Sequence, residues 1–436
     1  MRIGLLLMAI VALCPLSFIS QGPAVAADVK VPTARAEDVG MSAERLARVK
    51  TAMQRYVDRG EAPGVVTLIA RRGRVVHFES IGYRDVESRV PMTPDTIFRL
   101  ASMTKPIVAA ALMTLYEEGE FQLSDPVSTW LPEFKSMQVV QAQGADGSHS
   151  LAPARNPITI RHVLTHTSGV QSGGGLLGAQ YSKVAPRTVP NDTLASFVTR
   201  LAALPLNFEP GTKWEYGAAG NGLAVTGRLV EVISRKPLDR FIEERILRPL
   251  GMNDTYFYLP EEKLARFAVL YKPGPDNKIE IDEKPDRNSV YVRERTFLSG
   301  TGGLVSTVSD YLRFQQMMLN GGELDGVRIL GRKTVELMSS NHIGNLPVAS
   351  RGPGHGFGLG VSVVTDVGAS GQLGSVGTYG WGGATCTITF VDPAEEIIGI
   401  MMTQVRRCTA LNIRRDFQTL AYQAIVGSAR TARASN

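Results

Sequence analysis

The chain has few of the features that would assign it to common functional classes. Only three of its 436 residues are cysteines and six are histidines. The 47 basic and 41 acidic residues form no block of five or six like charges, so nucleic acid is not indicated as a partner. No Gly-x-Ser-x-Gly elbow, phosphate-binding loop or His-Glu-x-x-His motif occurs, and no dinucleotide fingerprint follows a predicted strand. These absences exclude the usual motif-level assignments to α/β-hydrolases, nucleotide-binding proteins and zinc proteases.

The first 26 residues have the pattern of a secretory signal peptide. Arg2 supplies a positive start, residues 3–13 are apolar, and Ala24-Val25-Ala26 is a small-x-small cleavage site. The apolar run is too short to span a bilayer comfortably, which favours a cleaved signal over an uncleaved anchor. We therefore predict a periplasmic or secreted protein that has no membrane span after cleavage.

Two cysteines remain after that cleavage, because Cys14 lies in the signal. Cys386 and Cys408 are free to pair in an oxidising compartment, but the sequence gives no geometry for them. A disulfide and two buried thiols both remain open. Neither cysteine lies in a Cys-x-x-Cys motif, so redox catalysis is not indicated.

Strand patterns lie near both ends of the chain, and helix patterns lie between them. We expect strands at 65–70, 75–79, 358–364, 384–391 and 396–404. Helices are expected at 102–118, 159–166, 192–204, 221–235, 238–247 and 410–426, with another from Ser42. Polar or glycine-rich segments at 141–157, 171–190, 272–290 and 366–380 are interpreted as loops. The pattern predicts an α+β fold, with a sheet domain from 27–104 and 300–436 and a mainly helical domain over 105–299.

One short motif indicates chemistry. Ser102-Met103-Thr104-Lys105 is the only Ser-x-x-Lys in the chain, and it lies where a helix is expected to begin. Three residues apart on a helix, the serine and lysine side chains share one face. A lysine can then take the proton of a serine nucleophile if its surroundings lower its pKa. The alternative is a helix-capping serine beside a solvated lysine.

The residues around this motif resemble the nucleophile region of the serine β-lactamase-like family. That family includes class C β-lactamases, D-alanyl-D-alanine carboxypeptidases and family VIII carboxylesterases. Further segments resemble the family in the same order along the chain. The matching segments are TIFRLASMTKP (96–106), IRHVLTHTSG (160–169), FEPGTKWEY (208–216), RPLGM (248–252) and GGLVST (302–307).

The resemblance implies a β-lactamase-like fold, an antiparallel sheet flanked by terminal helices with an inserted helical domain. It also implies catalytic roles for three residues. Ser102 would be the nucleophile, Lys105 its base partner, and Tyr216 a second acid/base that passes a proton to the leaving group. The alternative for Tyr216 is a half-buried structural aromatic.

Two departures from the family pattern bear on the substrate. Many relatives read Tyr-Ser-Asn where this chain reads Tyr216-Gly217-Ala218, and Ala218 has no side-chain amide. The third motif, which begins with Lys or His in β-lactamases and peptidases, corresponds here to Trp381-Gly382-Gly383-Ala384. This form resembles the family VIII carboxylesterases. By the same resemblance, Trp381, Gly382, Gly383 and Ala384 bind substrate, and the N–H groups of Ser102 and Ala384 form the oxyanion hole.

Replacing a cation by an indole should change the preferred substrate. A lysine would pair with a substrate carboxylate, whereas Trp381 offers apolar area and one N–H. We therefore predict hydrolysis of short-chain esters, unless Arg406 or Arg407 supplies the missing charge. Trp381 as a purely structural core aromatic is the alternative.

Other functions stay open at this point. A β-lactamase, a D-Ala-D-Ala carboxypeptidase or a small-amide hydrolase would use the same serine, and an acyltransferase would share its intermediate. A non-catalytic module that binds cell-wall fragments is an alternative of another class. His162 and His166 have the spacing of a metal pair, but few other ligand types lie nearby, so neither a metal nor an organic cofactor is expected.

Overall fold

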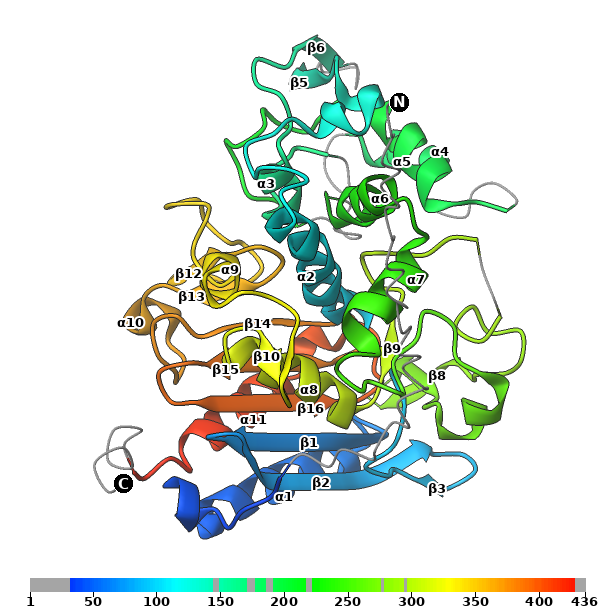
Figure 1. The fold of residues 1–436 in the computed structure, drawn as a ribbon. Helices are drawn as coiled ribbons and strands as arrows, with labels where there is room; N and C mark the ends of the chain where they lie inside the picture. Colours follow the sequence, from blue (N-terminus) through cyan, green and yellow to red (C-terminus); the bar gives the residue numbers. More distant parts are fainter. Residues whose placement is uncertain are drawn as a thin grey trace, which may run out of the picture. The chain divides into compact units, whose positions relative to one another are not determined.

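Strands from the two ends of the chain pair in one sheet (Figure 1). The computed structural model describes residues 32–143, 149–170, 177–185, 191–216, 222–275, 278–293 and 296–427. The strands of this sheet are β1 (Gly64–Arg71), β2 (Arg74–Asp85), β3 (Val90–Pro91), β12 (His355–Phe357), β13 (Ser362–Val364), β14 (Tyr379–Gly382), β15 (Ile388–Asp392) and β16 (Ile397–Met402). They follow the order β12-β13-β14-β15-β16-β1-β2-β3, and each neighbouring pair is antiparallel. With the helices described below, this sheet confirms the predicted α+β class.

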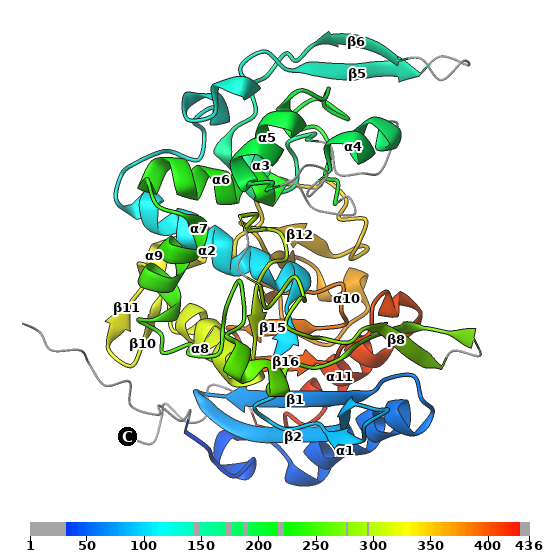
Figure 2. The same ribbon diagram turned by 90° about the vertical axis from the view of Figure 1, so that its right-hand side faces the viewer.

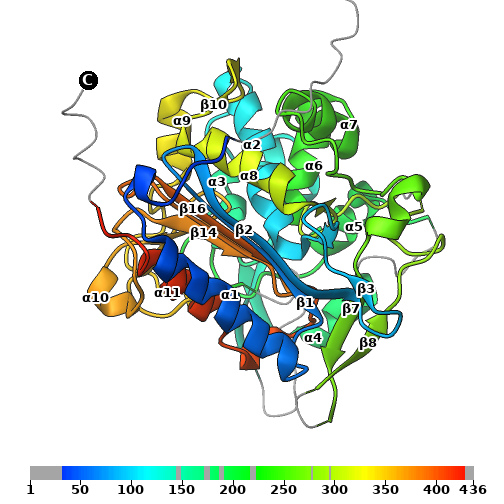
Figure 3. The same ribbon diagram turned by 90° about the horizontal axis from the view of Figure 1, so that it is seen from below.

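One face of the sheet is covered by the terminal helices α1 (Ala43–Asp58) and α11 (Ile413–Tyr422) (Figure 3). The Ser42 hydroxyl accepts a hydrogen bond from the N–H of Arg45 and so begins α1 as predicted. Apolar side chains of both helices pack with residues of β1, β15 and β16 in one buried cluster. Burial of this apolar stripe stabilises both helices far more than their propensity does.

The other face carries α8 (Val308–Leu319), and α2 (Thr104–Glu117) leads from it to the middle segment of the chain (Figure 1). Nearly all of α2 is buried, from Thr104 through Leu115. A helix that is apolar on all sides needs neighbours all round, and α6 (Gly222–Ser234) is one of them. The first turn of α2 is therefore held rigidly between the sheet and the helices.

Most of the remaining helices lie on the side of the sheet away from α1 (Figure 2). The other α-helices are α3 (Ile160–Leu164), α4 (Gly178–Val184), α5 (Leu194–Ala202), α7 (Leu238–Ile242), α9 (Arg332–Met338) and α10 (Val367–Ser370), with a π-helical turn at Glu243–Leu247. Two-stranded pairs are formed by β4 (Phe98–Arg99) with β9 (Val305–Ser306), β5 (Gln138–Gln143) with β6 (His149–Pro153), β7 (Leu270–Pro273) with β8 (Ile279–Glu283), and β10 (Glu323–Leu324) with β11 (Val327–Arg328). Short 3-10 turns are Glu37–Val39, Ala101–Met103, Val127–Thr129, Pro132–Phe134, Glu261–Arg266 and Cys408–Ala410.

Several predicted strands and loops are wrong in their bounds. Of the predicted strand 358–364 only β13 (Ser362–Val364) is strand, because the chain turns between β12 and β13, where Gly360 takes a left-handed φ of 83°. The predicted strand 384–391 begins only at Ile388, since residues 383–387 form a turn after β14. Hairpins occupy parts of the predicted loops 141–157 and 272–290, where polar side chains conceal the strand pattern.

The domain boundaries at residues 104/105 and 299/300 stay a prediction. Among the described helices, none combines the length and apolarity that a membrane crossing requires. The predicted signal peptide lies outside the described residues.

Candidate active site

Ser102 lies in a tight turn between β4 and α2. The predicted helix start is displaced, because Ser102 belongs to the 3-10 turn Ala101–Met103 and α2 begins at Thr104. Ala101 has a left-handed φ of 46°, a conformation that non-glycine residues rarely adopt and that is frequent at functional sites. Pro106, in the first turn of α2, needs no amide donor there and fits the helix start.

Lys105 points back to the serine from the first turn of α2. Its ammonium group donates to Ser102 Oγ at 2.8 Å and to the Thr301 carbonyl at 2.6 Å. The side chain is only 2% exposed, and in the described part of the chain no carboxylate pairs with it. A buried amine held against the hydroxyl is well placed to exchange a proton with it.

Tyr216 completes the group from a segment far away in sequence. Its Oη lies 2.6 Å from Ser102 Oγ, and Lys105 Nζ lies 5.2 Å from its ring centroid. Burial by itself would raise the pKa of Tyr216, but the Lys105 cation and the hydrogen bond with Ser102 outweigh it and lower that pKa below its ordinary value. The three residues singled out in the sequence therefore meet around one hydroxyl.

An aromatic box holds the Tyr216 ring. His166, Trp214 and Trp381 contact it with ring centroids 4.9, 6.2 and 5.2 Å away, and Phe357 packs against His166 and Trp381. Burial and the nearby Lys105 cation hold the pKa of His166 well below its usual range, so the imidazole is neutral. Its Nε2 has no hydrogen-bond partner among the described residues.

The histidine spacing that allowed a metal pair has another explanation. His162 Nδ1 accepts the Thr159 N–H while the Thr159 hydroxyl accepts the His162 N–H, which is a capping box at the start of α3. The structure places His166 in the aromatic box instead. No group of three metal-ligating side chains occurs among the residues that the structure describes. Ala218 and Asn221, which follow Tyr216, lie outside the described residues.

The Trp-Gly-Gly-Ala segment lies at the end of a strand. Trp381 and Gly382 close β14, and Gly383 and Ala384 open the turn to β15. A Cβ atom on Gly383 would stand 2.3 Å from the Leu100 carbonyl oxygen, so this glycine allows a close approach to the chain's own backbone. This backbone contact requires a glycine at position 383.

One backbone N–H group of the Ser102 turn and one of the turn after β14 remain available. Those of Ser102 and Ala384 have no acceptor among the described residues. Ser102 is half-buried and Ala384 is exposed. Free, preorganised donors of this kind stabilise the oxyanion of an acyl-transfer intermediate.

A family model described as Beta-lactamase matches residues 49–422. The chain belongs to the beta-lactamase family. It is 36% identical over 378 residues to Protein Rv1367c of Mycobacterium tuberculosis, covering 84% of this chain and 90% of that relative. It is 33% identical over 392 residues to Esterase EstB of Burkholderia gladioli, covering 85% of this chain and 93% of that esterase. The solved structure of EstCE1, described as a hydrolase with promiscuous acyltransferase activity, matches with a TM-score of 0.73 at 29% identity. The match covers 88% of this chain and 99% of EstCE1.

Membership of the beta-lactamase family confirms the predicted β-lactamase-like fold and makes this protein a serine hydrolase. The resemblance drawn from the Ser-x-x-Lys region and the later segments is confirmed as well. The individual roles of Ser102, Lys105, Tyr216 and residues 381–384 rest on the geometry above.

The structure also brings to this site a cation that the sequence did not indicate. The guanidinium carbon of Arg351 lies 4.9 Å from the Trp381 ring centroid. Burial lowers the pKa of Arg351 to about 10, with Tyr216 acting in the opposite direction. No local signal could have found Arg351, because it lies in an irregular segment 30 residues before Trp381.

Arg414 is a second cation near the same residues. It donates to the Gly383 carbonyl, and burial together with the Arg351 charge lowers its pKa to about 10. Both arginines line a cavity of about 300 Å³, and none of its described lining residues is acidic. Arg406, which the sequence offered as the missing cation, instead pairs with Asp282.

Proposed function

We propose that this enzyme hydrolyses short-chain carboxylic esters through an acyl-enzyme on Ser102. The observation that carries the proposal is the position of one hydroxyl, within 2.8 Å of Lys105 Nζ and 2.6 Å of Tyr216 Oη. A serine becomes a nucleophile when an adjacent base takes its proton, and both partners are in reach of that proton. The likeness to Esterase EstB and EstCE1 supports ester chemistry.

The steps follow from these positions. Ser102 Oγ attacks the ester carbonyl carbon while its proton passes to the Lys105–Tyr216 pair. The N–H groups of Ser102 and Ala384 bind the oxyanion, and Tyr216 returns the proton to the departing alkoxide. Water then attacks the carbonyl carbon of the acyl-enzyme, with Lys105, Tyr216 and the two N–H groups in the same roles. This step releases the acid and the free serine.

Steady-state hydrolysis of a 4-nitrophenyl butyrate ester by residues 27–436 tests the proposal. We expect turnover that falls about 1000-fold or more in Ser102→Ala, because this variant lacks the proposed nucleophile. Equal turnover by the two proteins would contradict it. Labelling of Ser102 by a fluorophosphonate without any turnover would favour the alternative of a binding module.

Arg351 and Arg414 favour a second candidate function. Their charges near Trp381 can receive a substrate carboxylate, as a β-lactamase, a D-Ala-D-Ala carboxypeptidase or a small-amide hydrolase acting on acidic substrates would require. Comparing the butyrate ester with a chromogenic cephalosporin separates the two functions. A kcat/KM that is higher for the cephalosporin would make this second function the principal one.

Export is also part of the proposal. The signal-like pattern of residues 1–26 supports cleavage after Ala26. The intact mass of the protein recovered from the cell exterior or periplasm should correspond to residues 27–436. A full-length mass would contradict cleavage.

A further inference from the structure

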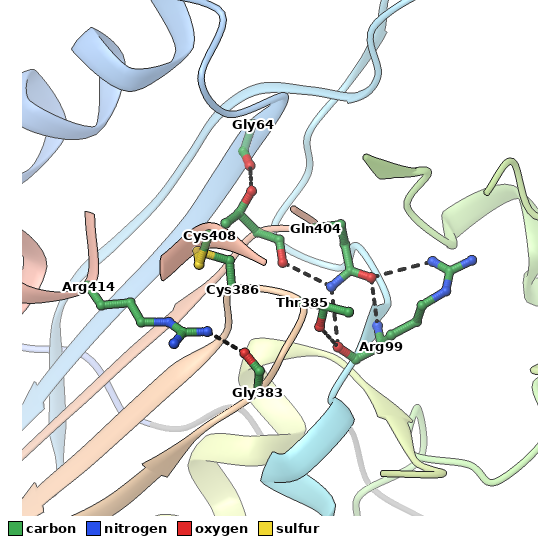
Figure 4. Close-up of a disulfide and its surroundings, with 9 residues drawn as sticks. Gly64, Arg99, Gly383, Thr385, Cys386, Gln404, Cys408 and Arg414 are labelled. Atoms are coloured by element: carbon green, nitrogen blue, oxygen red, sulfur yellow. Dashed lines mark hydrogen bonds between the residues drawn. A yellow bond between two sulfur atoms is a disulfide. The ribbon is translucent and has the colours of Figure 1, made fainter. Parts of the chain in front are cut away.

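The turn that carries Ala384 is covalently tied to the C-terminal part of the chain. Cys386 and Cys408 form a disulfide, with Cα atoms 5.7 Å apart, which answers the question the sequence left open (Figure 4). Cys386 lies in the turn between β14 and β15, and Cys408 begins the 3-10 turn that precedes α11. Both cysteines are buried, with exposures of 0% and 4%.

The same turn is bonded to the segment that leads into Ser102. The hydroxyls of Thr385 and Thr387 donate to the carbonyls of Arg99 and Leu100 at 2.8 and 3.3 Å. The side-chain amide of Gln404 accepts the Arg99 N–H at 3.1 Å and donates to the Arg99 carbonyl at 3.2 Å (Figure 4). The two threonine bonds fix the turn, and the Gln404 bonds fix the segment after β16, relative to the nucleophile segment.

The other supports of the turn come from the segment that Cys408 anchors. The Val405 N–H donates to the Thr385 carbonyl at 3.2 Å, and the Arg407 N–H donates to the Ala384 carbonyl at 3.3 Å. Arg414 donates to the Gly383 carbonyl, as Figure 4 shows. Any movement of the segment 405–414 is therefore transmitted to the peptide groups on both sides of Ala384.

The turn also contains a conformation that is unfavourable in isolation. Cys386 has a φ of 70°, in the left-handed region that L-residues other than glycine and asparagine seldom adopt. Such a residue stays in place only where its surroundings determine it. The disulfide is a direct covalent restraint on this residue.

We propose that the Cys386–Cys408 disulfide positions the second oxyanion-hole donor, the Ala384 N–H, relative to Ser102. Cys386 and Cys408 are positioning residues in this scheme, since neither touches the substrate. The proposal rests on the function proposed above and on the free N–H groups of Ser102 and Ala384. It states that the disulfide contributes to turnover in addition to stability.

The test compares residues 27–436 with the double variant Cys386→Ser/Cys408→Ser. The mature chain has no third cysteine, so the variant leaves no thiol to form a wrong pair. We expect kcat for the butyrate ester to fall about 10- to 100-fold, because loss of one oxyanion donor typically costs 100- to 1000-fold and this donor is displaced, not removed. KM should change less than about 3-fold, since the ground-state carbonyl is held less strongly than the oxyanion.

Two readouts separate positioning from general stability. The affinity of a trifluoromethyl ketone, which forms a tetrahedral adduct with the serine, should fall in parallel with kcat/KM when measured well below the melting temperature of the variant. A second double variant, Cys386→Gly/Cys408→Ser, should recover part of the lost kcat, because glycine adopts the left-handed conformation without strain.

The inference would be overturned if the folded Ser/Ser variant had the same kcat and the same adduct affinity as the wild type. It would also be overturned if the loss of kcat only matched the fraction of the variant that is unfolded. Failure of the proposed function would look different, because the wild-type protein itself would then show no ester turnover. In that case the rate of Ser102 phosphonylation in the two proteins still tests the inference. Equal rates would reject it, and a slower rate in the Ser/Ser variant would support it.

Discussion

The hydroxyl groups of Ser102 and Tyr216 lie 2.6 Å apart, although 114 residues separate them in the sequence. The turn before α2 carries the first hydroxyl, and the aromatic box that includes His166 and Trp381 orients the second. Lys105 is bonded to the first and adjacent to the ring of the second. This juxtaposition underlies the first prediction.

Removing the Tyr216 hydroxyl should slow the chemistry and leave the fold intact. Tyr216→Phe keeps the ring and its contacts, but it loses the hydroxyl to which we assign proton transfer to the leaving alkoxide. We expect kcat to fall about 100- to 10,000-fold, with little change in melting temperature. In the wild type, kcat/KM should rise with pH at values below 10, because the pKa of Tyr216 is lowered from its ordinary value. A variant that keeps more than half of the wild-type kcat would contradict the role of this phenol.

Arg351 should control the choice between neutral and acidic substrates. Arg351→Gln removes the charge beside Trp381 while keeping a polar side chain of similar reach. A charge-assisted hydrogen bond contributes about 1.5–3 kcal/mol, so the ester-to-cephalosporin ratio of kcat/KM should rise about 10-fold or more. Trp381→Lys is the complementary variant and should shift the ratio in favour of the cephalosporin. If neither variant changes the ratio, the residues around Trp381 do not determine specificity.

His166 should matter through its ring packing. Its left-handed φ of 58° makes asparagine a suitable replacement, because asparagine tolerates this conformation and alanine does so less well. His166→Asn removes the edge contacts with Tyr216 and Phe357. We expect kcat to fall about 10-fold, since a loosely held phenol is less often aligned with Ser102. A kcat equal to that of the wild type would show that the Tyr216 ring is held without His166.

Asp310 should make the stability of the fold depend on pH. Burial raises the pKa of this carboxyl to about 6, although it accepts hydrogen bonds from the Asp254 N–H at 2.7 Å and the Thr255 hydroxyl at 2.9 Å. Because the folded-state pKa exceeds the unfolded value near 3.9, the native state holds the proton more tightly between pH 4 and 6. The stability that Asp310 contributes is thus fully present below about pH 4 and is lost as pH rises through about 6.

The Asp310→Asn variant isolates this contribution. Asparagine can still accept both hydrogen bonds but does not titrate, so the difference in unfolding free energy between wild type and variant should change by about 3 kcal/mol from pH 4 to pH 7. Chemical denaturation at several pH values measures that difference. A difference that is constant over this interval would mean that the carboxyl has an ordinary pKa.

The sequence by itself determined the parts of this protein that depend on neighbours along the chain. The three-residue spacing of Ser102 and Lys105, with Pro106 at the helix start, specifies their contact within one turn. The cap at Ser42 and the apolar spacing after it likewise specified α1. Tyr216 was found through a resemblance of whole segments, since no local rule connects it to Ser102.

Only the tertiary structure decided which distant groups meet. Arg351 reaches Trp381 and Cys386 reaches Cys408 because the order of strands in the sheet brings their segments together. The sequence predicts strand from residue 384, in the turn 383–387, because apolar and β-branched residues favour strands in general. Here hydrogen bonds to Arg99 and Leu100, far earlier in the chain, outweigh that preference. Local propensities amount to tenths of a kcal/mol per residue, whereas buried hydrogen bonds and packing contribute more at each contact, so tertiary contacts set the final conformation.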